Sequence, residues 1–274
     1  EPAAQLHEAM AYAVLNGGKR MRAALVFGAA RMAVGQDADA APSEAMLRTA
    51  AAIEFLHAYS LVHDDLPAMD NAATRRGQPS CHIKFDESTA ILAGDALQTM
   101  AFEILADPRT HADAAVRIQL VATLAKAAGL QGMAGGQMLD LQAETRQFDL
   151  AETRQMQMMK TGALLSCAVV CCGIVGAAPP DMRAAQAAFA QDLGLAFQIA
   201  DDLLDYAGDA SVMGKPSGQD ADRGKAGFVA LMGVDAARRT AQRMIDDANA
   251  ALAPWQNTAH YMQNLATFAI TRNS

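Results

Sequence analysis

Residues 181–206 read DMRAAQAAFAQDLGLAFQIADDLLDY, a stretch rich in Ala, Leu, Gln and Asp with a single β-branched residue. Ala and Leu are strong helix formers, so this stretch is predicted to be one long helix. A polar stripe runs along its C-terminal half, because the members are spaced by three and four residues. The stripe consists of Gln198, Asp201, Asp202 and Asp205. The stretch therefore predicts both a helical fold and an acidic helix face.

The same helical composition extends over the rest of the chain. Hydrophobic residues make up 52% of the sequence and aromatic residues only 5%, and alternating runs of strand length are scarce. Gly and Pro punctuate the Ala- and Leu-rich stretches. We therefore expect an all-α fold in a single domain over residues 1–274. Helices are predicted at residues 2–15, 19–34, 42–65, 87–105, 111–130, 132–143, 149–176, 181–206, 226–252 and 257–270.

Composition also excludes several classes of protein. A formal net charge of −8 argues against a nucleic-acid binder, because phosphate backbones are bound by concentrated Lys and Arg. The longest apolar run, residues 162–178, is shorter than the ~20 residues of a membrane helix, so a buried core helix is expected instead. The four cysteines are expected to be reduced core thiols, which suits a cytoplasmic protein. The sequence begins without Met, so an upstream segment is expected to be missing.

The acidic stripe carries an electrostatic conflict. Like charges four residues apart destabilise a helix by about 0.2–0.5 kcal/mol, and the apolar residues beside these carboxylates would raise that cost by burying them. A hard divalent cation removes the conflict, since Mg²⁺ prefers oxygen ligands and sits between carboxylates and substrate phosphates. A metal site at Asp201, Asp202 and Asp205 is therefore predicted; a solvated acidic helix end is the alternative.

A second acidic cluster lies in HDDLPAMD at residues 63–70. On a straight helix Asp70 would point away from Asp64, because six residues are a rotation of about 240°. Pro67 disfavours continued helix before it, so a turn is predicted to bring Asp70 back toward Asp64. Asp64, Asp65 and Asp70 are thus candidates for a second metal site, and an ordinary acidic turn is the alternative.

Basic residues accompany both acidic clusters. GGKRMR at residues 17–22 is a glycine break opening a helix, where free N–H groups and the helix dipole favour an anion. Lys19 and Arg22 are expected to share a helix face. Arg75 and Arg76 lie in the irregular segment 67–80, and Lys215 and Lys225 lie in the irregular segment 208–227. This pattern suits a polyanionic ligand whose charge is neutralised partly by metal and partly by Arg and Lys. The irregular segments 67–80 and 208–227 are expected to be mobile and to cover the site.

Eight motifs occur together along the chain. They are GGKRMR (17–22), HAYSLVHDDLPAMD (57–70), RRGQPSCH (75–82), AGDALQ (93–98), GGQMLD (135–140), MKTGAL (159–164), FQIADDLLD (197–205) and the GK-rich segment 214–225. In these motifs the chain resembles the short-chain trans-isoprenyl diphosphate synthases, particularly the bacterial farnesyl diphosphate synthases, over nearly its whole length. The resemblance implies a helical bundle around a deep central pocket, usually dimeric and with no membrane span. It also implies three Mg²⁺ ions bound with the allylic substrate.

The implied reaction joins isopentenyl diphosphate to dimethylallyl or geranyl diphosphate by ionisation, condensation and elimination, giving farnesyl diphosphate. The resemblance implies a role for each matching residue. The metal ligands would be Asp64, Asp70 and Asp201, supported by Asp65, Asp202 and Asp205. Isopentenyl diphosphate would bind to Lys19, Arg22, His57 and Arg76, and the allylic diphosphate to Arg75, Lys160, Lys215 and Lys225. Thr161 and Gln198 would face the developing cation.

Product length is assigned to the helix before the first acidic cluster. Tyr59 lies five residues before Asp64, about 7.5 Å lower along the helix, where its ring would close the pocket. The resemblance implies that Tyr59 and its neighbour Ser60 select a farnesyl product, although core packing would also account for the ring. Geranyl and geranylgeranyl products remain alternatives.

One departure from the family pattern and several alternative functions bear on this assignment. Residues 71–74 read NAAT where the bacterial pattern has acidic residues, which weakens the negative field there. A terpene cyclase would also ionise a diphosphate with Mg²⁺, but it would have no second substrate for GGKRMR to bind. A regulatory subunit of the same fold would not need two complete acidic clusters, because burying them costs free energy. An HD-type phosphohydrolase would rest on only His63 and Asp64, and a nucleotide P-loop is excluded because Pro216 follows Lys215.

Overall fold

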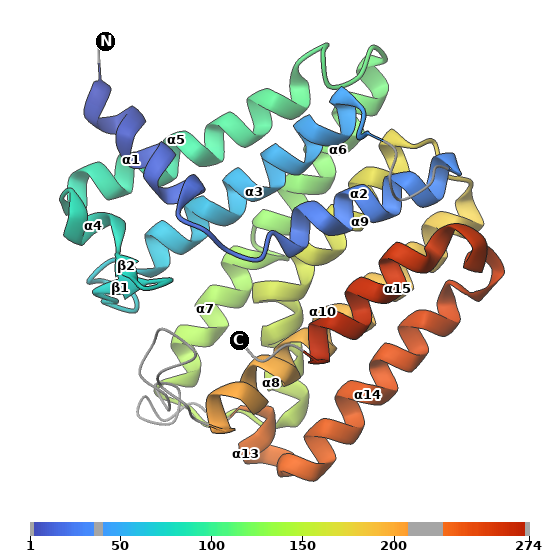
Figure 1. The fold of residues 1–274 in the computed structure, drawn as a ribbon. Helices are drawn as coiled ribbons and strands as arrows, with labels where there is room; N and C mark the ends of the chain where they lie inside the picture. The colour runs from blue at the N-terminus through green and yellow to red at the C-terminus, as the bar shows by residue number, and fades with distance from the viewer. Residues whose placement is uncertain (1–2, 36–40, 208–226, 272–274) are drawn as a thin grey trace.

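The computed structural model describes residues 3–35, 41–207 and 227–271 as a bundle of helices (Figure 1). The helices are Ala4–Leu15 (α1), Met21–Val34 (α2), Glu44–Asp64 (α3), Cys81–Lys84 (α4), Glu87–Ala106 (α5), Ala114–Ala128 (α6), Met133–Ala143 (α7), Leu150–Gln157 (α8), Ala163–Val175 (α9), Pro180–Ala207 (α10), Phe228–Met232 (α13), Val234–Ala251 (α14) and Gln256–Thr271 (α15). A π-helical turn, Met158–Gly162 (η1), joins α8 to α9, and a 3₁₀ turn, Ala253–Trp255 (η2), precedes α15. The predicted all-α fold is confirmed.

The core forms around α9, as its sequence predicts. This helix contacts α2, α3, α6 and α10, and most of its side chains are buried, including those of Leu164, Leu165 and Val169. On either side α3 packs along α5, and α10 packs along α14 (Figure 1). The helices that carry the two acidic clusters, α3 and α10, therefore both pack against α9. The four cysteines are free and buried, as predicted.

Two helical stretches are long and apolar enough to span a membrane by length and composition alone. They are Glu87–Ala106 and Leu150–Val175, and 33% and 50% of their most apolar windows are buried in the fold. Both pack against several other helices: α5 contacts α1, α3, α4 and α6, and α9 lies at the centre of the bundle. The absence of a membrane span stays a prediction.

The structure corrects two predicted helices. The predicted helix 226–252 is two helices over its described part, residues 227–252, because Gly233 adopts a positive φ of 82° between α13 and α14. Residues 149–176 do not form one regular α-helix, because the π turn at Met158–Gly162 interrupts it. Within segment 67–80, predicted to be irregular, Thr74–Arg75 (β1) and Gln78–Pro79 (β2) pair as a small antiparallel hairpin. Residues 208–226 lie outside the described residues.

Candidate active site

The chain reverses directly after α3 and brings the first acidic cluster together. The helix ends at Asp64, and the backbone N–H of Asp70 donates to the Asp64 carbonyl oxygen at 2.9 Å. The Asp70 carboxylate acts on the pKa of Asp64, so the two side chains are electrostatic neighbours. The turn predicted from Pro67 is confirmed, and it places Asp70 beside Asp64.

Asp64 lies in a crowded acidic environment. Its carboxylate accepts a hydrogen bond from Gln137 Nε2 at 2.7 Å. Burial raises the pKa of Asp64, and the carboxylates of Asp70 and Asp140 raise it further, whereas the charges of Lys160 and Arg75 oppose the rise. Carboxylates that disfavour one another's charge fit a hard divalent cation, which prefers oxygen ligands.

The carboxylates around Asp64 suit a metal ion that takes part of its ligands from a bound substrate. Among residues 3–35, 41–207 and 227–271, no three His, Cys, Asp or Glu side chains are close enough to bind a metal by themselves. Mg²⁺ normally takes only one or two carboxylates from the protein, and substrate phosphates and waters supply the remaining ligands. The arrangement therefore suits Mg²⁺ bound together with a phosphorylated substrate.

Asp65 is paired with Arg75 through two hydrogen bonds. Arg75 Nε and Nη2 lie 2.7 and 2.6 Å from the two carboxylate oxygens, and Asp65 is only 2% exposed. The same guanidinium lies 3.8 Å from Asp64. Arg75 thus carries its positive charge to the edge of the acidic cluster, and Asp65 holds it there.

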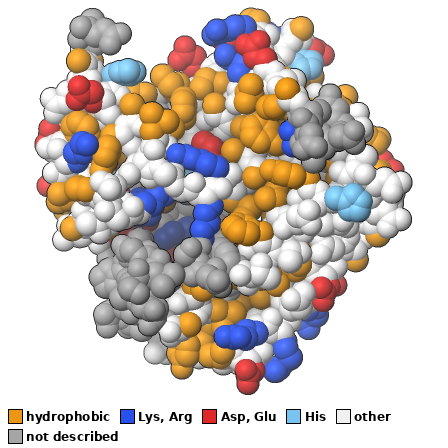
Figure 2. Space-filling model, in the orientation of Figure 1, with side chains coloured by type: hydrophobic (Ala, Val, Ile, Leu, Met, Phe, Trp, Pro, Cys, Tyr) orange, Lys and Arg blue, Asp and Glu red, His pale blue; other side chains and the backbone are white. Residues whose placement is uncertain are grey.

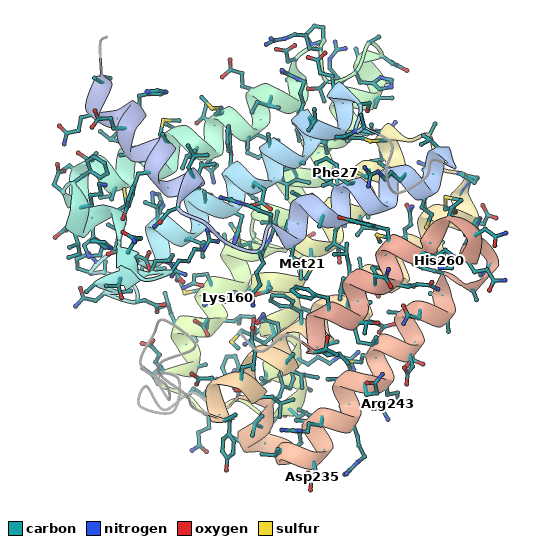
Figure 3. All side chains as sticks on the ribbon, in the orientation of Figure 1. Met21, Phe27, Lys160, Asp235, Arg243 and His260 are labelled. Carbon is teal, nitrogen blue, oxygen red and sulfur yellow. The ribbon has the colours of Figure 1, made fainter. Side chains whose placement is uncertain are left out.

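A positive charge enters the same cluster from the π turn. Lys160 Nζ donates to Asp140 Oδ2 at 2.8 Å. Figure 3 shows Lys160 in the interior of the bundle, whereas Asp235 and Arg243 lie at its edge. The backbone of the π turn comes so close to α7 that residue 136 must be glycine. A Cβ on Gly136 would lie 2.1 Å from the backbone nitrogen of Lys160. Single-turn π bulges are frequent at functional sites. The turn places Lys160 against Asp140 and within electrostatic reach of Asp64.

Gln137 and Asp140 are site residues to which the sequence analysis gave no role. Both lie on α7, within the motif GGQMLD. They are three residues apart, so they share a helix face. Two polar residues three apart, directly after a Gly–Gly step in an otherwise apolar stretch, are the signal that could have identified them.

The second acidic cluster lies on α10, as predicted, with Gln198 one turn before Asp201. Asp202 accepts a hydrogen bond from the Val229 N–H at 2.6 Å and so links α10 to the start of α13. This contact also needs a glycine, because a Cβ on Gly227 would lie 2.3 Å from Asp202 Oδ1. Asp202 therefore has a structural contact as well as a place in the acidic stripe.

Arg22 and Arg76 form a cationic cluster beside the acidic residues, and the His57 imidazole lies close to both. Burial lowers the pKa of Arg22 to about 10, the charge of Glu54 opposes that effect, and the Arg76 charge adds to it. The charge of Asp201 also acts on the pKa of Arg22, so Arg22 lies within electrostatic reach of the second acidic cluster. Burial, followed by the charges of four arginines, holds the pKa of His57 well below its usual value. His57 is therefore neutral at pH 7.

The cationic cluster has the properties of an anion site. Among the described residues Arg22 Nε is buried and lacks a hydrogen-bond partner, which costs free energy unless a ligand accepts that bond. Lys and Arg side chains gather around a hollow in the face of the molecule shown in Figure 2. An anion would satisfy Arg22 and offset the repulsion between guanidinium groups.

Arg76 approaches the glycine loop before α2. Its Nη1 donates to the Gly17 carbonyl oxygen at 2.6 Å, and a Cβ on Gly18 would lie 2.5 Å from the guanidinium carbon. Both glycines have positive φ, 73° and 101°. The prediction that Lys19 and Arg22 share a helix face is wrong, because α2 begins at Met21 and Arg20 has a left-handed backbone. Lys215 and Lys225 lie outside the described residues.

Glu54 of α3 binds the glycine loop before α2, a contact that the sequence did not predict. Its two carboxylate oxygens accept hydrogen bonds from Arg20 Nη1 and the Ala23 N–H, both at 3.1 Å. Arg20 also donates to the Val14 carbonyl oxygen. The Glu54 side chain is 10% exposed, so it is a buried charge committed to positioning the start of α2.

Replacing Glu54 with Gln is expected to weaken the cationic cluster selectively. The variant keeps the shape of the side chain but loses charge-assisted bonds worth about 1.5–3 kcal/mol. We expect roughly tenfold weaker binding of inorganic phosphate at Arg22 and Arg76. Isothermal titration calorimetry measures this affinity, and an unchanged affinity would contradict this role of Glu54.

One cavity brings Arg22, Asp64 and Lys160 together with apolar side chains. It has a volume of about 580 Å³ and is lined by Arg22, His57, Tyr59, Ser60, Leu61, His63, Asp64, Leu66, Ala68, Met69, Ile91, Met133, Ala134, Gln137, Met138, Leu141, Lys160 and Thr161. The volume lies within the ~300–1,000 Å³ typical of ligand pockets. The cavity is charged at Arg22, Asp64 and Lys160 and largely apolar elsewhere, which suits an anionic head group with a hydrocarbon tail.

Comparison with known proteins finds one family over most of the chain. The polyprenyl synthetase family profile matches residues 3–261. Farnesyl diphosphate synthases of Escherichia coli and Haemophilus influenzae are each 44% identical; the alignments cover 97% and 99% of this chain and 89% and 90% of those proteins.

Solved structures have the same fold. An FPP/GFPP synthase from Zymomonas mobilis is 42% identical with a TM-score of 0.86, and the match covers 99% of this chain and 90% of that one. A Helicobacter pylori geranyltransferase complexed with magnesium and isoprenyl diphosphate is 31% identical, also with a TM-score of 0.86, over 99% and 90% of the two chains. The chain therefore belongs to the polyprenyl synthetase family.

Proposed function

We infer that this protein is a Mg²⁺-dependent trans-isoprenyl diphosphate synthase that joins isopentenyl diphosphate to an allylic diphosphate, with farnesyl diphosphate as the best-supported product. The observation that carries this inference is the cavity of about 580 Å³, whose lining includes the acidic Asp64, the cationic Arg22 and apolar side chains. Two diphosphates and one growing hydrocarbon chain need these three environments.

We assign the allylic diphosphate to the acidic side. Asp64, Asp70 and Asp201 would hold Mg²⁺, with Asp65, Asp202 and Asp205 in support, and three ions are proposed. Bound Mg²⁺ would neutralise charge on the departing diphosphate. Lys160 and Arg75 add positive charge at the same end, because they reach Asp140 and Asp64 respectively. Fixed charges of this kind stabilise the leaving group as the carbon–oxygen bond breaks.

We assign isopentenyl diphosphate to the cationic side, at Arg22, His57 and Arg76. The double bond of the bound substrate attacks the allylic carbocation and forms the new carbon–carbon bond. A proton is then lost, and the released diphosphate is the base that accepts it. Thr161 lines the cavity beside Lys160, which supports its proposed contact with the cation. Gln198 is proposed for the same role, from its place one turn before Asp201.

Tyr59→Ala is expected to lengthen the product. Tyr59 and Ser60 line the cavity on α3, between His57 and Asp64 in the sequence of that helix. Removing the ring opens space for another isoprene unit, so we expect mainly geranylgeranyl or longer diphosphates. Mass spectrometry of the products measures this. An unchanged product length would remove Tyr59 as the floor of the cavity.

Dependence on substrates separates the candidate functions. With Mg²⁺ present, we expect diphosphate release to require both the allylic substrate and isopentenyl diphosphate. Release from a longer allylic diphosphate alone, with a cyclic hydrocarbon product, would indicate a terpene cyclase. Binding without turnover would indicate a regulatory subunit. The Arg22–His57–Arg76 cluster favours the synthase, because a cyclase has no second diphosphate to bind there.

A cytoplasmic homodimer is proposed as the working form. Apolar side chains stay exposed along α5 and α6, including Leu92 and Ile118, at 55% and 69%. Burying such side chains against a second copy would be favourable. Light scattering coupled to size-exclusion chromatography gives the mass in solution, and a monomer at micromolar concentration would contradict the proposal.

A further inference from the structure

Two adjacent arginines leave the β1–β2 hairpin toward different partners. Arg75 binds the Asp65 carboxylate through two hydrogen bonds, whereas Arg76 Nη1 donates to the Gly17 carbonyl oxygen at 2.6 Å. Arg75 is therefore part of the first acidic cluster, and Arg76 is part of the cationic cluster. A displacement of this one hairpin would disturb both parts of the site together.

The turn of the hairpin holds Arg76 in a conformation that arginine rarely adopts. Because Arg75 pairs with Gln78, Arg76 and Gly77 are the two residues of the connection. Both have a positive φ, 54° and 74°, as the central residues of a type I′ turn do. Glycine adopts a positive φ readily, but a residue with a Cβ keeps one only where its surroundings enforce it. Contacts outside the turn must therefore hold Arg76 in place.

Tyr12 of α1 provides a contact of this kind. Its hydroxyl donates to the Pro79 carbonyl oxygen of β2 at 2.6 Å, across 67 residues of sequence. Pro79 pairs with Thr74 of β1, so this bond attaches the hairpin as a unit to α1. The Ser80 hydroxyl, by contrast, donates to the Ala72 carbonyl oxygen and ties only the two ends of the hairpin to each other.

Packing alone does not fix the hairpin against α1. Tyr12, Arg75 and Arg76 are among the residues that line a small cavity of about 30 Å³. A space of that size has room for at least one water. The hairpin therefore has room to shift relative to α1, and the hydrogen bond between Tyr12 and Pro79 limits that shift.

The Tyr12 ring is held by contacts that do not involve its hydroxyl. Lys84 Nζ lies 4.1 Å from the ring centroid, within the ~6 Å of a cation–π contact. Phe85 meets the ring edge to face, with ring centroids 5.9 Å apart and ring planes at 73°. Replacing Tyr12 with Phe would therefore keep the ring in place and remove only the bond to Pro79.

We propose that Tyr12 is a positioning residue for both diphosphates: its hydroxyl fixes the hairpin so that Arg75 and Arg76 reach the acidic and the cationic side at the same time. The proposal rests on the proposed function and deepens it. Tyr12 does not line the cavity of about 580 Å³, so its effect on the substrates passes through the hairpin. Without the hydroxyl the hairpin shifts, and Arg76 relaxes toward a negative φ.

Tyr12→Phe is the decisive variant, and steady-state kinetics with one substrate varied at a time gives the KM of each substrate. We expect the KM values of isopentenyl and dimethylallyl diphosphates to rise together by about fivefold. The kcat should stay within about twofold of wild type, because both arginines bind diphosphate before and during the reaction. A role in stability alone would lower the melting temperature and leave both KM values unchanged. Tyr261→Phe, the same change on α15, is the matched control and should alter neither KM value.

Two further measurements test whether Tyr12 acts through the hairpin. In an Arg76→Gln background, Tyr12→Phe should raise the KM of isopentenyl diphosphate by less than about twofold, because the effects of coupled residues are not additive. Calorimetric titration of inorganic diphosphate without Mg²⁺ needs no turnover, and Tyr12→Phe should bind this anion about fivefold more weakly. A rise in only one KM or in neither, a fully additive double variant, or an unchanged diphosphate affinity would each overturn the proposal. Absence of condensation in wild type would instead contradict the proposed function, and the diphosphate affinity would then decide the role of Tyr12.

Discussion

Asp64→Asn is expected to lower kcat by roughly 10³-fold, equivalent to about 4 kcal/mol of transition-state stabilisation. The substitution keeps the shape of the side chain and leaves an acceptor for Gln137, but it removes the charge proposed to hold Mg²⁺ against the departing diphosphate. The Mg²⁺ concentration for half-maximal rate should also rise. Steady-state rates across a Mg²⁺ titration measure both effects.

The same variant is expected to be more stable than wild type in the absence of metal. Burial raises the pKa of Asp64 above its ordinary 3.8, so the folded state binds its proton more tightly than the unfolded state. The charged side chain therefore destabilises the fold increasingly as pH rises from 3.8 through the folded-state pKa. The melting temperature of Asp64→Asn should exceed that of wild type at pH 7, and the difference should vanish below pH 3.8.

Asp247→Asn is the control for Asp64→Asn. Asp247 is exposed on α14, so its loss should change neither rate nor Mg²⁺ dependence. An Asp64→Asn enzyme with more than a tenth of the wild-type kcat would contradict the proposed role of Asp64.

Lys160→Met is expected to lower kcat by about 10²–10³-fold, because the positive charge beside Asp64 is lost while most of the side-chain volume is kept. Here stability should change in the opposite direction. Asp140 is 5% exposed and would keep its buried charge without Lys160. Breaking a buried pair in this way costs about 3–5 kcal/mol, so the melting temperature should fall.

Lys126→Met, on an exposed position of α6, is the matched control and should leave rate and melting temperature unchanged. Restoring charge balance offers a further test of Lys160→Met. Adding Asp140→Asn should recover part of the lost stability without recovering the rate. A Lys160→Met variant with a wild-type kcat would show that Lys160 does not act on the leaving group.

Local rules explain the parts of the site that the sequence predicted correctly. The stripe on α10 follows from spacings of three and four residues in an uninterrupted helix. The return of Asp70 follows from what Pro67 does to the residues before it. Both depend on neighbours close in sequence, and the structure confirms both placements.

Tertiary contacts explain what the sequence did not predict. Glu54 is about thirty residues from the loop that it holds, and Asp140 is twenty from Lys160. No local pattern distinguishes such a buried charge from an ordinary polar residue in a helix. The prediction for Lys19 is wrong for a related reason: the left-handed backbone of Arg20, which ion-pairs with Glu54, delays the start of α2.

The glycines also show which features depend on tertiary contacts and which on the local backbone. Gly94 and Gly136 both lie inside helices and do not break them, because each provides room for a side chain or backbone from another helix. Gly233 does end a helix, and its positive φ is the physical difference. Sequence alone does not distinguish a glycine that makes room for a neighbour from one that turns the chain.

The most direct test of the central claim is to incubate the protein with isopentenyl and dimethylallyl diphosphates and identify the products by mass, with Mg²⁺ and with Mg²⁺ removed by a chelator. We predict farnesyl diphosphate as the main product, and only when Mg²⁺ is present. A folded protein that incorporates no isopentenyl diphosphate under these conditions would contradict the assignment of this site to prenyl transfer.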